Sequence, residues 1–387
     1  MFSSRSSIDL SPNRLSIALA RARASDRPVL DLTESNPTRA GIPYDTDAIR
    51  AAFGEAPFLR YEPAPFGIAF AREAVARDLS AHGSAIDPSR IVLTASTSEG
   101  YAFLFKLLAD PGDEVLVPVP SYPLFEHLAR LESVRAIPYR LAYDGAWHVD
   151  LASARAAATP RTRAIIVVHP NNPTGSYLKK SEFDALASLG LPIVSDEVFA
   201  RFPLREDRSR CASVLERSAA PLVFSLGGLS KLAGLPQMKL AWMAAAGEGP
   251  RVDAALARLE VVADAFLSVG TPVQLALSRL LACRGPAEEA IRLRTRANLA
   301  YVRAAVAGSA ASVLDVEGGW YVTLRLPRTE SEERWVLTLI EEDSVYVHPG
   351  HFFDFDQEAY VVVSLLTPEA IFREGVDRIV QRVRACS

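Results

Sequence analysis

Ser225-Leu-Gly-Gly-Leu-Ser-Lys231-Leu-Ala-Gly-Leu-Pro-Gln-Met-Lys239-Leu-Ala-Trp-Met243 is the stretch from which the fold of this chain can be predicted. The apolar run Pro221 to Phe224 before it predicts a buried strand, and we expect Gly227 and Gly228 to end that strand. Lys231 then lies in a loop of small residues. Because the chain has only five lysines, a lysine in this loop indicates a role other than surface charge.

Lys231 can therefore be interpreted either as a reactive amine or as an ordinary lysine near the surface. Burial lowers the pKa of an ammonium group, and a neutral amine can form a Schiff base with a carbonyl compound. On the plain interpretation the side chain packs its aliphatic stem and keeps its ammonium in water. The loop alone does not decide between the two.

Length and composition indicate a globular protein with a small-molecule partner. At 387 residues the chain can bury a large core, and its size fits one large domain with a smaller one. It is 49% hydrophobic and 23% charged, and its formal net charge is -4 with both signs interspersed. That distribution creates no field that would attract nucleic acid or a membrane surface.

The cysteines and the N-terminal residues predict a cytoplasmic location. Cys211, Cys283 and Cys386 lie too far apart for a disulfide framework or a CxxC metal site, so we expect reduced thiols and no metal. Residues 1–11 lack the apolar core of an export signal, and no apolar run reaches the roughly 18 residues that span a bilayer.

Strand and helix patterns alternate along the middle of the chain, from Ile91 to about Ala246. This alternation predicts an α/β fold with a mostly parallel sheet and helices on both faces. Buried strands are predicted at 91–94, 115–119, 164–168 and 191–195, and helices at 68–82 and 99–108. Outside this region we predict helices at 14–23 and 286–307 and strands at 29–32, 313–316, 320–326, 345–348 and 360–364.

Polar residues follow two of the buried strands. Ser96 and Thr97 open a helix, where unpaired backbone N–H groups and the helix dipole favour a phosphate. An ordinary hydroxyl cap is the alternative. Asp196 ends another strand, and a carboxylate at that end faces the ligand side of an α/β sheet. Its alternatives are a helix cap or an arginine partner.

Four short motifs occur in order along the chain: Pro120-Ser121-Tyr122-Pro123, Asn171-Asn172-Pro173-Thr174-Gly175, Asp196-Glu197, and Ser230-Lys231 followed by Gly234-Leu235-Pro236. Together they resemble those of the class I and II aminotransferases, which are fold-type I pyridoxal-phosphate enzymes. The resemblance extends from about Asp31 to the last helix. It implies a large cofactor-binding domain over 50–285 and a smaller α+β domain that joins 1–49 to 286–387.

The resemblance also implies roles for individual residues. Lys231 would form a Schiff base with pyridoxal 5′-phosphate, and Asp196 would pair with the protonated pyridine nitrogen. Asn172 would donate a hydrogen bond to the 3′ oxygen of the ring. The ring of Tyr122 would stack on the pyridine.

Further matches concern the phosphate and a second subunit. Ser96, Thr97 and Lys239 would hold the phosphate, with Lys239 at a position where the family commonly has an arginine. A lysine supplies a point charge without the bidentate fork of an arginine. Tyr61 would reach the phosphate of the other subunit of a homodimer, although a packing tyrosine under a loop explains its position equally well. Asn36 lies in the N-terminal arm, which in the family reaches the substrate side of the cofactor.

Three other positions depart from the family pattern. Phe199 replaces a tyrosine that contacts the cofactor oxygen, and Gly228 replaces a serine that contacts the phosphate. Val362 stands where the family has an arginine that binds the substrate α-carboxylate. Because a valine cannot pair with a carboxylate, either another cation does so or the substrate lacks that group. Arg39 is our candidate replacement.

The implied function is that of a pyridoxal-phosphate-dependent aminotransferase, which moves an amino group from an amino acid or amine to a 2-oxo acid. Lys231 would also move the proton of the substrate Cα. A decarboxylase or β-lyase of the same fold is an alternative, because the cofactor motifs do not determine which bond breaks. A non-catalytic effector-binding module is a third reading, and the lack of a basic helical domain ahead of Asp31 argues against it.

Overall fold

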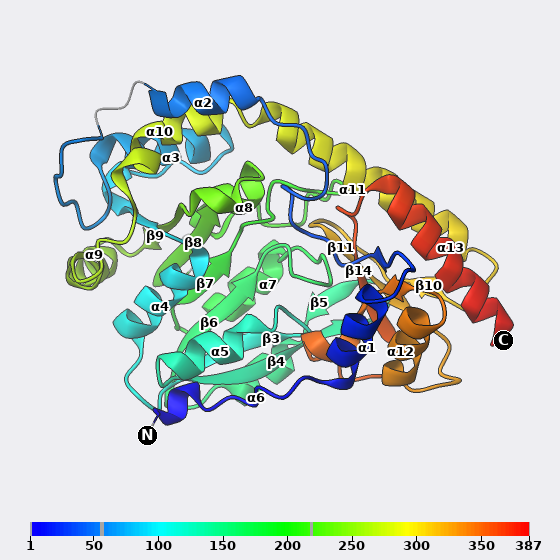
Figure 1. Cartoon of the computed structure of the whole chain (residues 1–387). Coiled ribbons are helices and arrows are strands. Elements are labelled where there is room, and N and C mark those ends of the chain that lie inside the picture. The colour runs from blue at the N-terminus through cyan, green and yellow to red at the C-terminus, as the bar shows by residue number, and fades with distance from the viewer. Residues whose placement is uncertain (1, 55–57, 217–219, 387) are drawn as a thin grey trace.

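The computed structural model describes residues 2–54, 58–216 and 220–386 and contains a large and a smaller sheet (Figure 1). The long helix α11 (Gly285–Val306) runs from the part built on the large sheet to the part built on the smaller one (Figure 1). Among the helices described, none combines the length and the apolar character needed to cross a bilayer.

The large sheet confirms the predicted α/β architecture. Its strands are β2 (Ile91–Thr94), β3 (Glu114–Val119), β4 (Arg135–Tyr143), β5 (Trp147–Val149), β6 (Thr162–Val168), β7 (Ile193–Asp196), β8 (Leu222–Gly228) and β9 (Ala241–Gly247). Within the described residues they lie in the order β2-β9-β8-β7-β6-β3-β4-β5. The central strands β8, β7, β6, β3 and β4 are parallel. Antiparallel pairs at the edges, β2 with β9 and β4 with β5, were not predicted.

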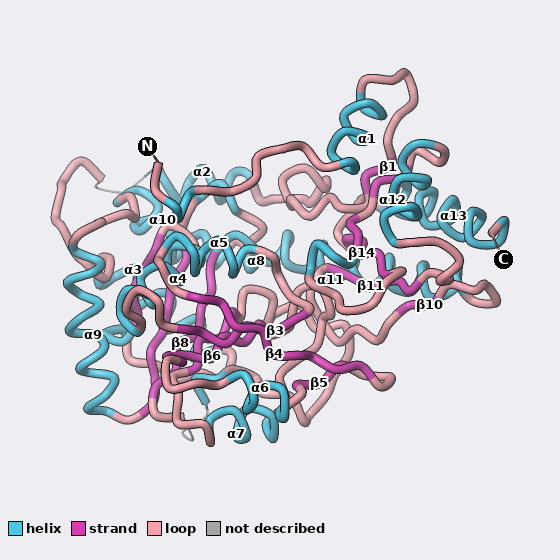
Figure 2. The backbone as a smooth tube through the Cα atoms, turned by 90° about the horizontal axis from the view of Figure 1, so that it is seen from below, coloured by secondary structure: helices cyan, strands magenta, loops and turns pink. Residues whose placement is uncertain are grey.

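Helices cover both faces of this sheet (Figure 2). One face packs against α4 (Thr97–Leu108), α5 (Leu124–Leu131) and α9 (Gly249–Asp264), and the other against α6 (Leu151–Ala157) and α7 (Lys180–Ala187). Because alternate strand residues enter the two cores, the central strands read as continuous apolar runs. A further layer beside β2 and β9 contains α2 (Thr46–Gly54), α3 (Ala69–Ala81), α8 (Leu229–Leu232) and α10 (Thr271–Ala282).

The smaller sheet is antiparallel, and the core built on it includes residues from both ends of the chain. It contains β10 (Ser312–Val313), β11 (Tyr321–Arg325), β14 (Tyr360–Ser364) and β13 (His348–Pro349), in that order. Beside it, β1 (Leu30–Asp31) pairs in parallel with β12 (Val345–Tyr346). One core joins this sheet to α1 (Arg14–Arg23), α12 (Glu332–Glu341) and α13 (Glu369–Ala385). Short 3-10 helices lie at Ser4–Ser6, Pro88–Arg90, Val214–Glu216, Pro236–Met238 and Gly350–Phe353.

The strand before Lys231 is longer than predicted. β8 continues through both glycines, with Gly227 opposite Trp242 and Gly228 opposite Ala241 of β9. A Cβ atom at position 227 would lie 2.6 Å from Nε1 of Trp242, so the indole requires a glycine beneath it. The strand does end at Gly228, but the two glycines are paired members of it and do not interrupt it, because they permit a close approach of β9. Lys231 therefore lies in the short helix α8, directly after the strand.

Candidate active site

The predicted cofactor residues lie at the ends of neighbouring strands. Lys231 follows β8, Asp196 ends β7, and Asn172 follows β6. These strands are adjacent and parallel, so their carboxyl ends meet at one edge of the sheet. Ser96 follows β2, which points the same way because β9 lies antiparallel between β2 and β8. The sheet thus gathers at one edge four residues that are far apart in sequence.

The ammonium of Lys231 lies among aromatic rings. Its Nζ is 5.5 Å from the ring centre of Phe199 and 5.2 Å from that of Trp320. Trp320 is fully buried and packs edge-on against Phe199. Burial lowers the pKa of Lys231, and the charge of Asp196 opposes that shift. A lowered pKa increases the fraction of neutral amine, which is the nucleophilic form.

Asp196 faces this lysine from the next strand. Its Oδ1 accepts a hydrogen bond from the N–H of Val198 at 3.2 Å, and its Oδ2 accepts one from the hydroxyl of Tyr101 at 3.4 Å. Burial raises the pKa of the Asp196 carboxyl to about 6, although these donors and Lys231 act in the opposite direction. No arginine pairs with it in the part of the chain that the structure describes. A carboxylate in such surroundings is stabilised when it meets a cation.

The raised pKa of Asp196 predicts a pH-dependent change in stability. Between about pH 4, near the pKa of an exposed aspartate, and about pH 6, the folded protein holds a proton that the unfolded chain has lost. Stability therefore falls as the pH rises through this window. We expect Asp196→Asn to raise the melting temperature of the ligand-free protein by a few degrees at pH 8 and not at pH 4. Asp253→Asn, at an exposed position of α9, serves as the control, and an equal effect of Asp196→Asn at both pH values would contradict the prediction.

The structure distinguishes two consecutive asparagines. The Oδ1 atom of Asn171 accepts from Ser121 Oγ at 2.7 Å, and its Nδ2 donates to Pro120 O and to Thr174 Oγ1 at 2.9 Å each. Asn172 is also buried, but its Oδ1 has no hydrogen-bond partner in the described residues. Buried polar atoms are rarely left unpaired. Asn171 is therefore held by the protein through both atoms of its amide, whereas the Oδ1 atom of Asn172 is not.

The first turn of α4 forms another end of the site. Ser96 Oγ accepts from the N–H of Glu99 at 3.2 Å, so Ser96 caps the helix. The Glu99 carboxylate accepts in turn from the N–H of Ala95 at 2.7 Å and from the hydroxyl of Ser268 at 2.5 Å. Thr97 is the first residue of the helix, where backbone N–H groups lack partners within the helix.

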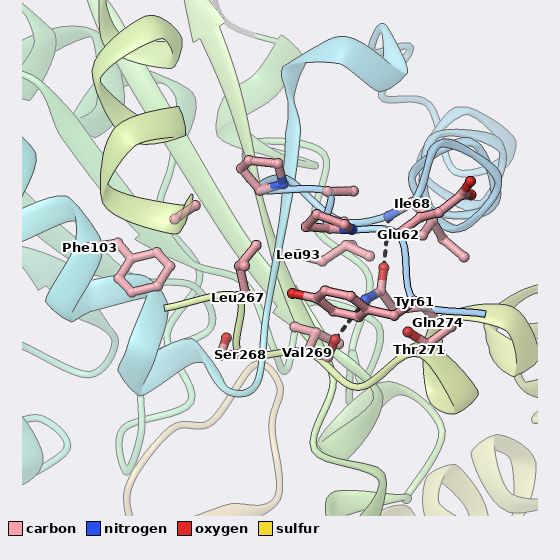
Figure 3. Close-up of a pocket in the computed structure, with 15 residues that line it drawn as sticks. Tyr61, Glu62, Ile68, Leu93, Phe103, Leu267, Ser268, Val269, Thr271 and Gln274 are labelled. Carbon is pink, nitrogen blue, oxygen red and sulfur yellow. Dashed lines mark hydrogen bonds between the residues drawn. The ribbon is translucent and has the colours of Figure 1, made fainter. Parts of the chain in front are cut away.

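Two tyrosines named from the sequence lie in different surroundings. Tyr122 is 44% exposed, and the pKa of its hydroxyl is raised by burial and by the nearby charge of Asp196. Tyr61 is 74% exposed and lies beside a shallow pocket of about 40 Å³ (Figure 3). Gln274 holds the two loops around that pocket, accepting from the N–H of Ile68 and donating to the carbonyl of Val269 at 2.8 Å each (Figure 3). Neither Lys231 nor Asp196 lines it.

The remaining predicted residues lie nearer the surface. Lys239 is exposed and has a left-handed backbone, with φ at 48°. Oδ1 of Asn36 accepts from the N–H and hydroxyl of Thr38 at 3.1 and 2.8 Å, and so shapes the turn that carries Arg39. Arg39 is exposed, and its guanidinium makes no hydrogen bond or ion pair with the residues described.

Val362 is fully buried in β14, between Thr323 of β11 and His348 of β13. Because directly paired residues lie on the same face of a sheet, these three side chains form one row. Thr323 Oγ1 and His348 Nδ1 are buried without a hydrogen-bond partner among the described residues. Burial also lowers the pKa of His348, which favours its neutral form. The row therefore supplies no permanent cation in place of the missing arginine.

Three residues of the site were not predicted from the sequence. They are Tyr101, which donates to Asp196, Trp320, which packs on Lys231, and Tyr321. Burial raises the pKa of Tyr321 to about 12, and the hydroxyl of Ser35 and the charge of Tyr122 act on it from nearby. The sequence offers one signal for Trp320, the pair Gly318-Gly319 directly before it, because consecutive glycines often mark a close approach of the backbone. In the structure, a Cβ atom at position 318 would lie 2.5 Å from the ring of Tyr177.

Known proteins of one family resemble this chain. The family model for aminotransferases of class I and II matches residues 27–379. Human tyrosine aminotransferase is 25% identical over 376 residues, which cover 92% of this chain and 80% of that protein. Glutamate-pyruvate aminotransferase of Escherichia coli is 29% identical over 220 residues, or 56% of this chain and 54% of that protein. The solved structure of an alanine aminotransferase from Pyrococcus furiosus matches with a TM-score of 0.88 and 22% identity over 100% of both chains.

Proposed function

The chain belongs to the class I and II aminotransferase family and is an aminotransferase, and from this premise we propose that it binds pyridoxal phosphate covalently at Lys231. The observation that carries the proposal is that Lys231 and Asp196 face each other at one edge of the large sheet. Lys231 is an amine with a lowered pKa, and Asp196 facing it is a carboxyl with a raised pKa. Oppositely shifted groups at a strand end are typical of a catalytic site.

The surrounding residues fit the polar groups of this cofactor. Asp196 would pair with the ring nitrogen, and a cation there would relieve the unfavourable burial of its carboxylate. The Nδ2 atom of Asn172 would donate a hydrogen bond to the oxygen on the ring, because the buried Oδ1, which lacks a partner among the described residues, can only accept. The partly exposed ring of Tyr122 would cover one face of the pyridine. Ser96 and Thr97 would hold the phosphate at the start of α4.

We also propose a homodimer in which Tyr61 and Lys239 approach the phosphate. Both side chains are exposed in the single chain, and Phe58 and Leu59 beside Tyr61 are 46% and 95% exposed. Neighbouring exposed apolar side chains are typical of a protein interface. The cofactor domain over 50–285 and the small domain over 1–49 and 286–387 are part of the same proposal. A cytoplasmic location agrees with the three cysteines, which form no disulfide within the described residues.

The reaction would depend on four side chains of this protein. Pyridoxal phosphate supplies an electron sink for charge that develops at the substrate Cα. Lys231 would bind the cofactor and, once released by the substrate amine, remove the proton from Cα. Asp196 would hold a proton at the ring nitrogen. Phe199 and Trp320 would keep water from the amine of Lys231, which preserves its neutral form.

Half-transamination tests this function against the alternatives. An excess of amino donor should remove the absorbance of the lysine-bound cofactor, and a 2-oxo acid should restore it. Release of carbon dioxide, or of ammonia with an oxo acid formed from the donor alone, would instead indicate a decarboxylase or a β-lyase. An unchanged spectrum with every amino donor tested would contradict the proposed activity.

Arg39 is proposed to bind the substrate carboxylate that Val362 cannot bind. We expect Arg39→Ala to raise KM for the best amino acid donor about tenfold or more, because a charge-assisted pair is lost. Activity on amines without a carboxylate should stay nearly unchanged. Arg50→Ala, an exposed arginine of α2, is the matched control. An unchanged KM together with good turnover of amines would show that the substrate carries no carboxylate at that end.

A further inference from the structure

A second cavity, of about 330 Å³, lies beside β7 and β8. Its lining includes residues 225–228 of β8, Glu197, and the side chains of Arg201, Arg210 and Arg292. We call it the arginine cavity. None of the residues assigned to the cofactor lines it, so it is separate from the site around Lys231.

The arginine cavity opens on the opposite face of the sheet from Asp196. Successive residues of a strand point to opposite faces, and Glu197 directly follows Asp196. Asp196 meets Tyr101 of α4, whereas the Glu197 carboxylate accepts from the N–H of Val214 at 2.9 Å, on the side of the sheet that carries α7. The cavity therefore lies beside the end of β8, the strand that leads into the helix carrying Lys231.

Positive charge exceeds negative charge around this cavity. The carboxylate of Glu288 is shared by Arg201, Arg284 and Arg292, at 3.4, 3.1 and 2.7 Å. Arg284 has a second partner, Asp78, at 2.7 Å. The two carboxylates, of Glu288 and Asp78, thus neutralise part of the charge of three arginines, and Arg210 adds a fourth positive charge. Burial raises the pKa of Glu197, which reduces the negative charge that it can contribute.

Arg210 is the arginine of this group that has no counterion in the part of the chain that the structure describes. Its guanidinium lies over the ring of Tyr177, 4.7 Å from the ring centre, so the plane of the group is fixed by packing. Its Nη1 is buried and has no hydrogen-bond partner among the described residues. No carboxylate of the described chain forms an ion pair with it. Because Arg210 lines the cavity and has no ion-pair partner among the described residues, an anion bound in the cavity would supply the missing counterion.

We propose that the arginine cavity is a second ligand site, which binds a small molecule carrying a carboxylate or phosphate group against Arg210. A planar guanidinium pairs with the two oxygens of such a group. The volume lies at the lower end of the range of ligand pockets, which suits a small metabolite. Ser213 and His82 line the same cavity and offer hydrogen-bonding groups to the rest of the molecule.

Isothermal titration of the cofactor-saturated enzyme tests this site. The titrants are inorganic phosphate and citrate, which separate the two possible oxyanions, and saturation with cofactor fills the phosphate position beside Ser96. We expect at least one titrant to bind at millimolar concentration or below. Arg210→Gln should weaken that binding about tenfold or more, because the charge-assisted pair is lost. Arg208→Gln, an exposed arginine of the same loop, should bind like the wild type.

A second pair of variants avoids any effect on folding from the loss of the Arg210 side chain. Ala212 lines the arginine cavity and is exposed. Ala212→Glu adds a negative charge and should abolish anion binding, whereas Ala212→Gln, of the same size, should weaken it much less. Three results would overturn the proposal: no binding of either titrant to the wild type, unchanged binding in Arg210→Gln, or equal binding by the two Ala212 variants.

Discussion

Replacement of Lys231 by alanine is expected to lower the rate of transamination by about four orders of magnitude or more. No other described lysine is placed to take over its role. Lys179 is held by Asp207 and Glu317 at 2.8 and 2.6 Å, and Lys239 is exposed. Lys231 alone has an amine that lies between Phe199 and Trp320 within reach of the charge of Asp196.

Borohydride reduction followed by peptide mass analysis tests this prediction independently of activity, because it shows which lysine carries the cofactor. In the wild type the cofactor mass should be fixed to the peptide that contains Lys231, and in Lys231→Ala it should be fixed to none. Lys180→Ala, which removes an exposed lysine at the start of α7, should retain both labelling and activity. Normal turnover in Lys231→Ala would contradict the proposed site and the proposed cofactor together.

The strand ends that carry the site could be predicted because local signals and tertiary structure agree there. The apolar run before Asp196 is buried on both faces, and in the structure it ends at that residue. The helix at 14–23 and the strand at 360–364 match the predicted bounds, since their periodicities are strong. Chain direction was less predictable. β9 is as apolar as the parallel strands of the sheet, and nothing in its own residues shows that it runs antiparallel to β8.

Features that depend on contacts between distant residues could not be predicted. Gly227 is a strand breaker by local propensity, but the indole of Trp242 packs against it and keeps it in the strand. The approach of Tyr101 to Asp196 joins residues 95 positions apart in the chain. The sequence likewise does not show that Arg210 lacks an ion-pair partner among the described residues, because the residues around it come from several separate segments.

Asp196→Asn is expected to slow removal of the substrate Cα proton about a hundredfold or more while the cofactor still binds. The carboxylate would hold a proton at the ring nitrogen, and the neutral amide of asparagine cannot stabilise that positive charge to the same degree. In the proposed site, covalent attachment would depend on Lys231 and phosphate binding on the start of α4, so neither should be lost. The loss should therefore lie in kcat and not in the binding of cofactor.

Exchange of deuterium from a donor labelled at Cα measures that step directly, and Asp253→Asn should exchange at the wild-type rate. Wild-type exchange in Asp196→Asn would show that the carboxylate has only a structural role. The same substitution is expected to stabilise the ligand-free protein at pH 8, because it removes a buried carboxylate whose pKa is raised to about 6. A slower and more stable variant would show that the fold keeps an unfavourable charge at this strand end because the reaction requires it.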